Sequence, residues 1–452
     1  MEFSPDRIYK DFLENKLDKS ATVKLLLSLI ENSDNDKARA ECIKDLSLLG
    51  INDEYVFKIL ENLFISDSSE LIRNSAALTL QNNYLDIIFE PMKWAMIHEE
   101  SPCCLNTIYS TLIKILNNFL NDPNPLVKPT LISEVKSIGR KEFRVGLETI
   151  CETKDIDTFT KKELIDILIN YFTMIFLEKS YWRLKFRIEN CTIVELDFTF
   201  KGITNLPEAI KNLTHLKTLS LRYNQIIHLP EWLGFLSSLE ELNVNVNNLN
   251  GLPHSIGKLS SLKKLELWKN ELNNLPSTIG KLSSLEILNL RLNQLKYLPE
   301  TIETLFSLKE LNLRDNQLNT LPTSLSSLIS LEKLNLSWNN IEVLPNSLGH
   351  LTSLKILDLE RNELKFLPES IGCLSSLEFL NLSDNKLTKI PKSIGNLKSL
   401  QYLNLSRNAL DSLPESIKAL TSLKELYLGE NDISMIPNNL KDLEYGNLKI
   451  YF

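Results

Sequence analysis

The chain has 452 residues and a formal net charge of −8, with 43% apolar and 24% charged residues. This composition is that of a soluble globular protein, and its acidic balance argues against nucleic-acid binding, which usually uses a strongly basic domain. The six cysteines include no CxxC pair, which predicts a reducing environment and no disulfide framework.

No segment has the pattern of a targeting or membrane sequence. Charged residues are spread through residues 1–16, so this stretch does not resemble a signal peptide. The most apolar run, 164–177, is short and contains Asp166 and Asn170, which favours a packed helix over a membrane span. We therefore expect a cytoplasmic protein without a membrane span.

Residues 1–180 show apolar residues at helical spacing with polar breaks. The segments 37–50 and 67–81 resemble each other at an offset of 34 residues, and a third copy is expected at 122–135. This pattern predicts an all-α, HEAT-like domain, although an irregular helical bundle remains an alternative. The matching residues are Arg39, Ile43 and Leu46 in the first copy, Arg73, Ala77 and Leu80 in the second, and Lys128, Ile132 and Val135 in the third.

A 23-residue period dominates the rest of the chain. Ten regular repeats run without insertion from 216 to 445, with Leu, Ile or Val at positions 1, 4, 6, 11, 14, 18 and 21, Asn at position 9 and Pro at position 15. A degenerate repeat at 193–215 carries Lys201 in place of the asparagine. We expect a junction at 181–192, a leucine-rich domain at 193–452 and a closing strand at 446–452. Self-similarity at a fixed period predicts a solenoid.

The spacing within one repeat predicts its local structure. Positions 4 and 6 lie two apart and belong on one face of a strand. The later apolar positions lie three apart, and Pro at position 15 cannot continue a ladder, which predicts a 3₁₀-like return. Stacked strands then form one parallel sheet over an apolar core. The asparagine at position 9 is expected to satisfy backbone groups that the bend exposes in its own and the neighbouring repeat.

The pattern L-x-x-L-x-L-x-x-N-x-L-x-x-L-P-x-x-I-x-x-L resembles the typical class of leucine-rich repeat proteins, over 193–452. The stretch 367–387 is similar to the intracellular Ras-group type, which includes Ras-binding scaffolds. The resemblance implies an α/β solenoid, a horseshoe with a concave parallel sheet. It also implies a role in holding partners rather than in catalysis, with a small GTPase as one candidate partner.

The variable positions indicate where a partner binds. If positions 4 and 6 point inward, positions 3, 5 and 7 point onto the concave face and position 8 lies at its edge. Trp and Arg dominate binding hot spots, and positions 7 and 8 are rich in both; the alternative is a set of isolated surface aromatics. We predict a partner-binding site here, called the basic-aromatic surface: Arg222, Tyr223, Trp268, Lys269, Arg291, Arg314, Trp338 and Arg361.

A second candidate patch lies in the later repeats. It consists of Ile356, Phe379, Tyr402 and Tyr427. Contiguous exposed apolar side chains often mark an interface, but lateral packing between strands explains them equally well. At position 2, Lys and Glu alternate from repeat to repeat, which predicts a solvated ladder of weak ion pairs.

The sequence holds no pattern typical of catalytic, metal or cofactor sites. The stretch 251–260 imitates a phosphate-binding loop but has five residues between its glycines and lacks Ser or Thr after Lys258. We therefore expect no enzyme and no cofactor, but a protein-binding scaffold in signal transduction. The alternative is a regulatory or targeting subunit of a kinase, phosphatase or ubiquitin ligase.

Overall fold

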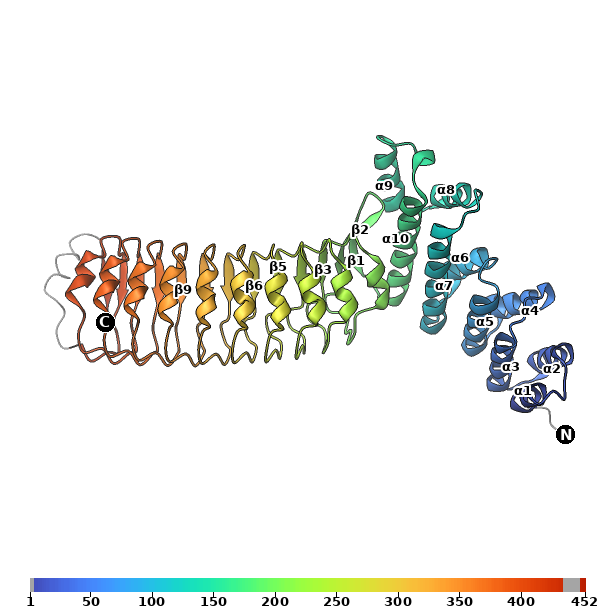
Figure 1. Cartoon of the computed structure of the whole chain (residues 1–452), viewed down its shortest axis with the longest axis horizontal. Coiled ribbons are helices and arrows are strands. Elements are labelled where there is room, and N and C mark those ends of the chain that lie inside the picture. Colours follow the sequence, from blue (N-terminus) through green and yellow to red (C-terminus); the bar gives the residue numbers. More distant parts are fainter. Residues whose placement is uncertain (1–3, 434–447) are drawn as a thin grey trace. The chain divides into compact units, whose positions relative to one another are not determined.

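The computed structural model describes residues 4–433 and 448–452. The chain divides into two compact units, each described by itself (Figure 1). The helical unit comprises Met1–Leu184 and Ile188–Ile193, and the solenoid unit comprises Lys185–Arg187 and Val194–Phe452.

In the part that the structure describes, the helical unit is built from α-helices and a short 3₁₀ helix, η1 (Ile156–Thr158). Several helices begin at a side-chain cap of the kind that satisfies the free N–H groups of a first turn. Asp53 caps α4, and Thr160 and Glu163 form a reciprocal capping box at α10. The helices are α1 (Pro5–Leu13), α2 (Lys19–Asn32), α3 (Asp36–Leu48), α4 (Glu54–Ser66), α5 (Glu70–Asn83), α6 (Phe89–His98), α7 (Pro102–Asn121), α8 (Val127–Ser137), α9 (Lys141–Cys151) and α10 (Lys161–Ser180).

Helix pairs stack on one another, as the sequence predicts. Helices α3, α5, α7 and α10 pack in succession, and α2, α4, α6 and α8 each pack on one of them. The matched arginines are equivalent: Arg39 reaches Asp67 at 2.6 Å, just after α4, and Arg73 reaches Glu99 at 2.8 Å, just after α6. The third copy is wrongly placed at 122–135, because α7, not α8, packs next to α5 in the stack. Helix α7 has no arginine to correspond to Arg39 and Arg73, so the comparison of the copies by sequence did not identify it.

Among the residues that the structure describes, a 13-stranded sheet follows chain order. Strand β1 leads into β2 through Asn190 and Cys191, both with left-handed backbone, the geometry of a tight hairpin turn. From β2 to β13 neighbouring strands are parallel and in register. The strands are β1 (Lys185–Glu189), β2 (Thr192–Asp197), β3 (Thr218–Ser220), β4 (Glu241–Asn243), β5 (Lys264–Glu266), β6 (Ile287–Asn289), β7 (Glu310–Asn312), β8 (Lys333–Asn335), β9 (Ile356–Asp358), β10 (Phe379–Asn381), β11 (Tyr402–Asn404), β12 (Glu425–Tyr427) and β13 (Lys449–Tyr451).

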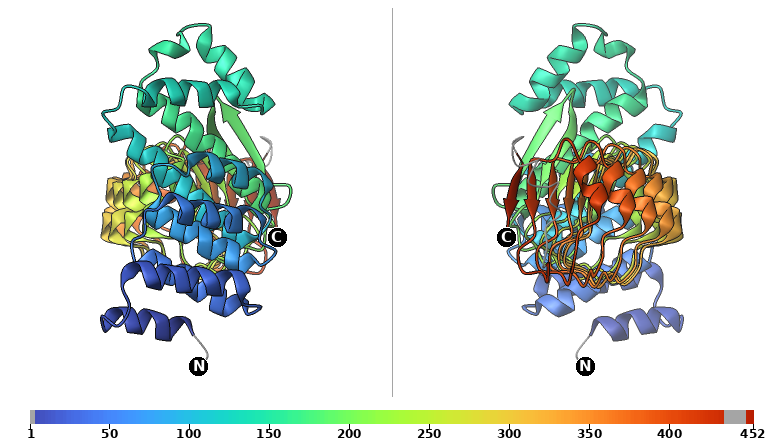
Figure 2. Two further views of the ribbon diagram at one scale, coloured as in Figure 1. Left: turned by 90° about the vertical axis from the view of Figure 1, so that its right-hand side faces the viewer. Right: turned by 90° about the vertical axis from the view of Figure 1, so that its left-hand side faces the viewer.

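Each proline at position 15 that the structure describes precedes a 3₁₀ helix, which confirms the predicted return. Proline fixes φ near the helical value and needs no hydrogen-bond acceptor. The strands lie on one side of the solenoid unit and the 3₁₀ helices on the other (Figure 2). The 3₁₀ helices are η2 (Glu208–Asn212), η3 (Glu231–Phe235), η4 (His254–Lys258), η5 (Ser277–Lys281), η6 (Glu300–Thr304), η7 (Thr323–Ser327), η8 (Asn346–His350), η9 (Glu369–Cys373), η10 (Lys392–Asn396) and η11 (Glu415–Ala419).

The predicted apolar positions form the solenoid core. In the ten regular repeats, all the described ones are buried except Leu252 and Ile433, which are half-buried. The end of the tenth repeat (434–445) and residues 446–447 of the expected closing strand lie outside the described residues. Strand β13 lies within the remainder of that closing stretch.

The ten asparagines form the expected ladder. Asn339 illustrates it: its Nδ2 donates to the carbonyl oxygens of Leu336 at 2.9 Å and Leu313, one repeat earlier, at 3.0 Å. Its Oδ1 accepts the Leu318 N–H at 2.9 Å. The Leu313 oxygen also accepts from Asn316, so neighbouring asparagines share each carbonyl.

Among the helices that the structure describes, none is both long and apolar enough to cross a bilayer.

Candidate partner-binding surface

Positions 7 and 8 form two adjacent columns just beyond the strands, one step apart in each repeat. At position 8 the backbone is left-handed in the degenerate repeat and in all ten regular ones, with φ between 53° and 58°. Gly, Asn and Asp adopt this conformation most easily, and other side chains pay of order 1–3 kcal/mol. Large side chains in this column, above all the β-branched Val246, are therefore not explained by the backbone.

Arg222 and Tyr223 lie at the start of these columns. The Arg222 guanidinium lies 5.3 Å from the centroid of the Tyr223 ring. Tyr223 stacks on Phe200 of the degenerate repeat, with ring centroids 4.4 Å apart. Phe200 is 71% exposed, so the basic-aromatic surface extends one repeat further than the sequence analysis placed it.

The repeat that contains Trp268 differs from most others at position 5. In most repeats an Asn or Asp at position 5 accepts the N–H of position 7 and so shapes the bend. Glu266 occupies position 5 in this repeat, and the backbone N–H of Trp268 donates instead to Asn245 Oδ1 at 2.7 Å. The Trp268 ring is half-buried and Lys269, next to it, is exposed.

The arginines of the next repeats form ion pairs within the chain. Arg314 Nε lies 3.2 Å and Arg291 Nε 3.6 Å from the same oxygen of Asp315. Arg361 Nε lies 3.2 Å from Asp384. Asp315 and Asp384 therefore already offset the charges of three arginines of the basic-aromatic surface.

Trp338 lies beside two of these arginines. The Arg361 guanidinium lies 3.9 Å and the Arg314 guanidinium 5.7 Å from the ring centroid. Such contacts contribute about 0.5–1 kcal/mol at exposed sites. Trp338 is still 36% exposed, so the indole is held in place while part of it stays accessible.

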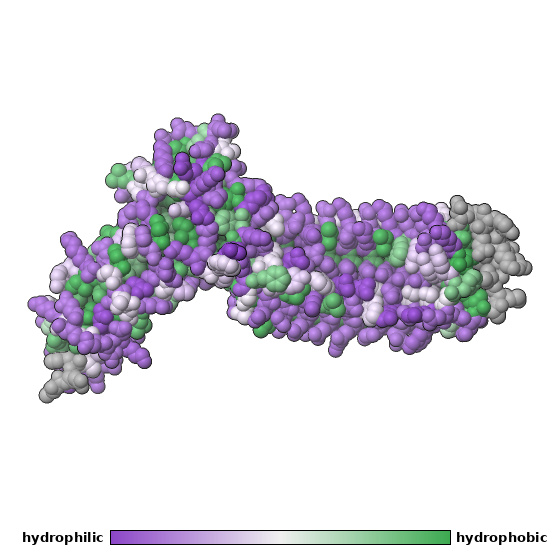
Figure 3. Space-filling view, turned by 180° about the vertical axis from the view of Figure 1, so that it is seen from behind, coloured by the Kyte–Doolittle hydropathy of each residue, from purple (hydrophilic) through white to green (hydrophobic). Residues whose placement is uncertain are grey.

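Two carboxyl groups of strand β9 and its bend lie in this part of the sheet. Burial raises the pKa of Asp358, against hydrogen bonds and the Arg314 charge that lower it. Burial and the Asp358 charge raise the pKa of Glu360. From β9 onward the two columns carry both signs of charge, with Glu360, Asp384 and Glu430 beside Arg361 and Arg407. Viewed from the sheet side, the solenoid unit is mostly hydrophilic with small apolar groups (Figure 3).

The second candidate patch is a ladder of half-buried rings. Phe379 and Tyr402 stack at 4.4 Å and 9°, and Tyr402 lies 5.3 Å from Tyr427. Tyr451, which the sequence analysis did not include, stacks on Tyr427 at 4.4 Å, and Ile356 adjoins Phe379 in register. Since the rings cover one another's faces, this geometry favours lateral packing over partner binding.

If the ring ladder is structural, Tyr402→Ala should lower the free energy of unfolding by about 1–2 kcal/mol. The estimate counts one or two aromatic contacts at 0.5–1.5 kcal/mol each. Urea unfolding followed by circular dichroism measures it, with the exposed Lys389→Ala as control. An unchanged midpoint together with lost partner binding would identify this ladder as the binding site instead.

The margin of the sheet carries the predicted ion-pair ladder at position 2. Three of its Lys–Glu contacts are 2.7–2.8 Å long between partly exposed side chains: Lys263–Glu240, Lys309–Glu286 and Lys355–Glu332. Pairs of this kind contribute little each, so they serve as neutral controls below.

The two columns also contain residues that were not predicted as part of the site. Phe200, Val246 and Leu292 all lie at position 8, and aligning this whole column, including the degenerate repeat, would have found them. The pairing of Asp315 with two arginines of the neighbouring column could not be found this way, because it depends on side-chain conformation.

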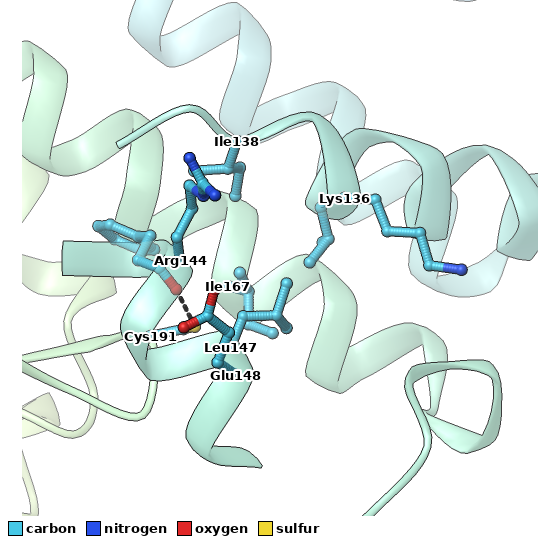
Figure 4. Close-up of a pocket in the computed structure, with 9 residues that line it drawn as sticks. Lys136, Ile138, Arg144, Leu147, Glu148, Ile167 and Cys191 are labelled. Carbon is cyan, nitrogen blue, oxygen red and sulfur yellow. Dashed lines mark hydrogen bonds between the residues drawn. The ribbon is translucent and has the colours of Figure 1, made fainter. Parts of the chain in front are cut away.

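A small pocket in the helical unit, about 150 Å³ in volume, is lined mainly by α8, α9 and α10 (Figure 4). Drug-sized ligands need roughly 300–1,000 Å³. Cys191 donates from Sγ to the Phe143 carbonyl at 3.2 Å, and burial raises the pKa of its thiol to about 12. This thiol is therefore an unreactive packing residue. Within residues 4–433 and 448–452, no three His, Cys, Asp or Glu side chains are grouped as metal ligands would be.

Comparison with protein-family models matches the solenoid unit. The model for a leucine-rich repeat region matches 194–271, 253–338 and 368–448, and a second leucine-rich repeat model matches 329–387. The chain is a leucine-rich repeat protein. No curated protein matches it.

Several solved structures resemble part of the chain. A leucine-rich repeat protein of Leptospira interrogans is 30% identical, with 57% of this chain and 83% of that chain covered and a TM-score of 0.35. A TDR receptor is 31% identical over 57% of this chain and 46% of its own, with a TM-score of 0.52. The plant peptide hormone receptor RGFR1, solved in complex with RGF2, is 26% identical over 58% and 47%, with a TM-score of 0.47. The chain thus spans less than half the length of either receptor.

Proposed function

We propose that this leucine-rich repeat protein is a non-enzymatic, cytoplasmic scaffold that binds a partner protein through the basic-aromatic surface. Solenoids of this kind present extended concave binding surfaces. The observation that supports the proposal most directly is Trp338, held by Arg314 and Arg361 yet still partly exposed. The fold requires no large side chain at that position, so a binding role accounts for it.

Affinity capture with the full chain, followed by mass spectrometry, identifies the partner. The captured protein is then titrated against single variants of the surface. Trp338→Ala and Trp268→Ala should each weaken binding by about 2 kcal/mol or more, as hot-spot truncations do. Arg314→Glu should weaken it as well, because it places a second negative charge beside Asp315.

The matched control is Lys309→Glu, which changes the same charge on the sheet margin. Its partner Glu286 is 2.7 Å away and both side chains are about half exposed. Binding that is unchanged in all three surface variants, but lost in Phe379→Ala or Tyr402→Ala, would move the site to the ring ladder. Binding unaffected by all five substitutions would place it outside the sheet face and contradict the proposal.

A small GTPase is the finer candidate, supported by the resemblance of 367–387 to Ras-group repeats. Purified small GTPases loaded with GDP or with a GTP analogue provide the test. A scaffold for a signalling GTPase should bind one nucleotide state at least tenfold more tightly, and equal or absent binding counts against this candidate.

The alternative, a regulatory subunit that targets an enzyme, is favoured by apolar side chains on the helical unit. Tyr55 of α4 and Trp94 and Ile97 of α6 are 64%, 45% and 50% exposed. If they hold a second protein, a kinase, phosphatase or ligase activity should co-purify with the wild-type chain and be lost in a Tyr55→Ser/Trp94→Ser variant that still binds the first partner.

A further inference from the structure

Three N–H groups in the position-7 column are buried without a hydrogen-bond acceptor among the described residues: Arg222 Nε, Trp268 Nε1 and Arg291 Nε. The nearest carboxylate oxygen to Arg291 Nε, on Asp315, lies 3.6 Å away. Buried donors are normally paired, and unpaired ones are costly to keep. All three lie in the first four regular repeats, so these unpaired donors mark one part of the sheet.

An apolar column runs beside these donors. Between the degenerate repeat and the sixth regular one, position 8 carries five apolar or aromatic side chains, interrupted by Lys269 and Asp315: Phe200, Tyr223, Val246, Leu292 and Trp338. All are exposed or half-buried, in a backbone conformation that does not favour such side chains. From repeat seven onward the same column holds only charged residues among those described: Arg361, Asp384, Arg407 and Glu430. These form ion pairs with one another, at 3.2, 3.6 and 3.0 Å. Among the described residues, the apolar side chains of this column therefore lie in the degenerate and first six regular repeats, a stretch that includes the three repeats with an unpaired donor.

The same stretch has an excess of positive charge. In the first five regular repeats, positions 7 and 8 hold four cations, Arg222, Lys269, Arg291 and Arg314, against one anion, Asp315. Asp315 pairs with two of the arginines. Arg222 and Lys269 form no ion pair within the residues that the structure describes, so their charges are available to a ligand.

We propose that this edge of the sheet, from Phe200 to Trp338, binds an acidic segment of a partner protein in extended form. Apolar side chains of the segment cover the position-8 column. Its carboxylates face Arg222 and Lys269. This inference rests on the proposed function and adds the chemistry of the partner.

The dimensions fit such a segment. Phe200 and Trp338 are six strand steps apart, which is about 29 Å at ~4.8 Å per step. An extended chain covers that length with roughly nine residues at ~3.3 Å each. The contact features form two parallel lines rather than a round patch. Val246 and Leu292 have no stacking faces for nucleobases, so a peptide fits the column better than a single-stranded nucleic acid.

Selection from a library of random displayed 12-residue peptides on the immobilised full chain tests the proposal without knowledge of the partner. The enriched peptides should combine Asp or Glu with apolar residues. Individual peptides, synthesised with a fluorescent label, should bind at least tenfold more weakly to the Arg222→Glu/Lys269→Glu variant. Lys309→Glu/Lys355→Glu, which reverses the same number of charges on the sheet margin, should leave their binding unchanged. Circular dichroism of each variant checks that the fold is retained.

Four outcomes would overturn the proposal: no enrichment, enrichment without acidic residues, equal binding to the Arg222→Glu/Lys269→Glu variant, or tighter binding of a 12-nucleotide single-stranded RNA than of the peptides with the same variant sensitivity. These outcomes differ from failure of the proposed function. A captured partner that is sensitive to Trp338→Ala while no acidic peptide is enriched would support a folded partner on this surface and reject only the extended segment.

Discussion

Replacing Arg73 with alanine should destabilise the helical unit by about 2–4 kcal/mol, the largest effect expected of a single substitution here. Arg73 makes a two-bond contact with Glu99, at 2.8 and 3.0 Å, and also donates to the carbonyl of Asp67 at 2.9 Å. The two side chains are only 18% and 9% exposed. Breaking a buried pair costs about 3–5 kcal/mol. We expect a smaller loss of stability for Arg73→Ala because Glu99 still accepts two backbone N–H groups in the variant.

The loss of stability in Arg73→Ala should depend on pH. Burial raises the pKa of Glu99, but the hydrogen bonds and charge of Arg73, with the backbone N–H groups, outweigh it and lower the pKa below 4.5. A carboxylate with a lowered folded-state pKa stabilises the fold above its unfolded pKa, and this contribution is lost as the pH falls through the folded value. The difference between wild type and Arg73→Ala should therefore be full at pH 7 and shrink below about pH 4.

Urea unfolding at pH 7 and at acid pH measures this difference. Lys58→Ala is the matched control, since it breaks an exposed pair with Glu54 in the same unit and should cost less than 1 kcal/mol. An Arg73→Ala variant no less stable than Lys58→Ala at pH 7, or a difference that does not change with pH, would show that the Glu99 pair does not stabilise the stack.

Asn339→Ala should destabilise the solenoid unit by about 2–3 kcal/mol. The Leu318 N–H loses its acceptor, Asn339 Oδ1, inside the core. The Leu313 and Leu336 carbonyls each lose one of two amide donors. An unsatisfied buried group costs about 1–3 kcal/mol. The loss of stability should lie in the upper part of this range and not exceed it, because each of the two carbonyls keeps its second amide donor.

The adjacent Asn340, which is exposed, provides the control. Asn340→Ala removes the same side chain one residue later and should leave the denaturation midpoint within experimental error. Solenoid stability is a sum over neighbouring repeats, so the local loss should also appear as faster amide exchange in the repeats that contain Leu318 and Asn339. Equal midpoints for the two variants would contradict the ladder.

The sequence by itself determined the solenoid and its core. Apolar positions such as Leu313 and Leu336 recur at a fixed period, and they are buried together when neighbouring repeats stack on one another. It also determined the role of the asparagines, because a buried amide at a repeated bend must pair with the backbone around it. In the helical unit it determined the equivalence of Arg39 and Arg73, since both lie in the same turn of matching helices.

Only the tertiary structure decided which charges and rings are available at the surface. Asp315 forms an ion pair with Arg291 of the preceding repeat, and the rings of Phe379 and Tyr402 stack on each other across neighbouring strands. Such contacts join residues one repeat apart through side-chain conformations that no spacing encodes. The succession of α5 and α7 was hidden for a related reason: helices pack through whole apolar faces, and the residue types on those faces can change while the packing is kept.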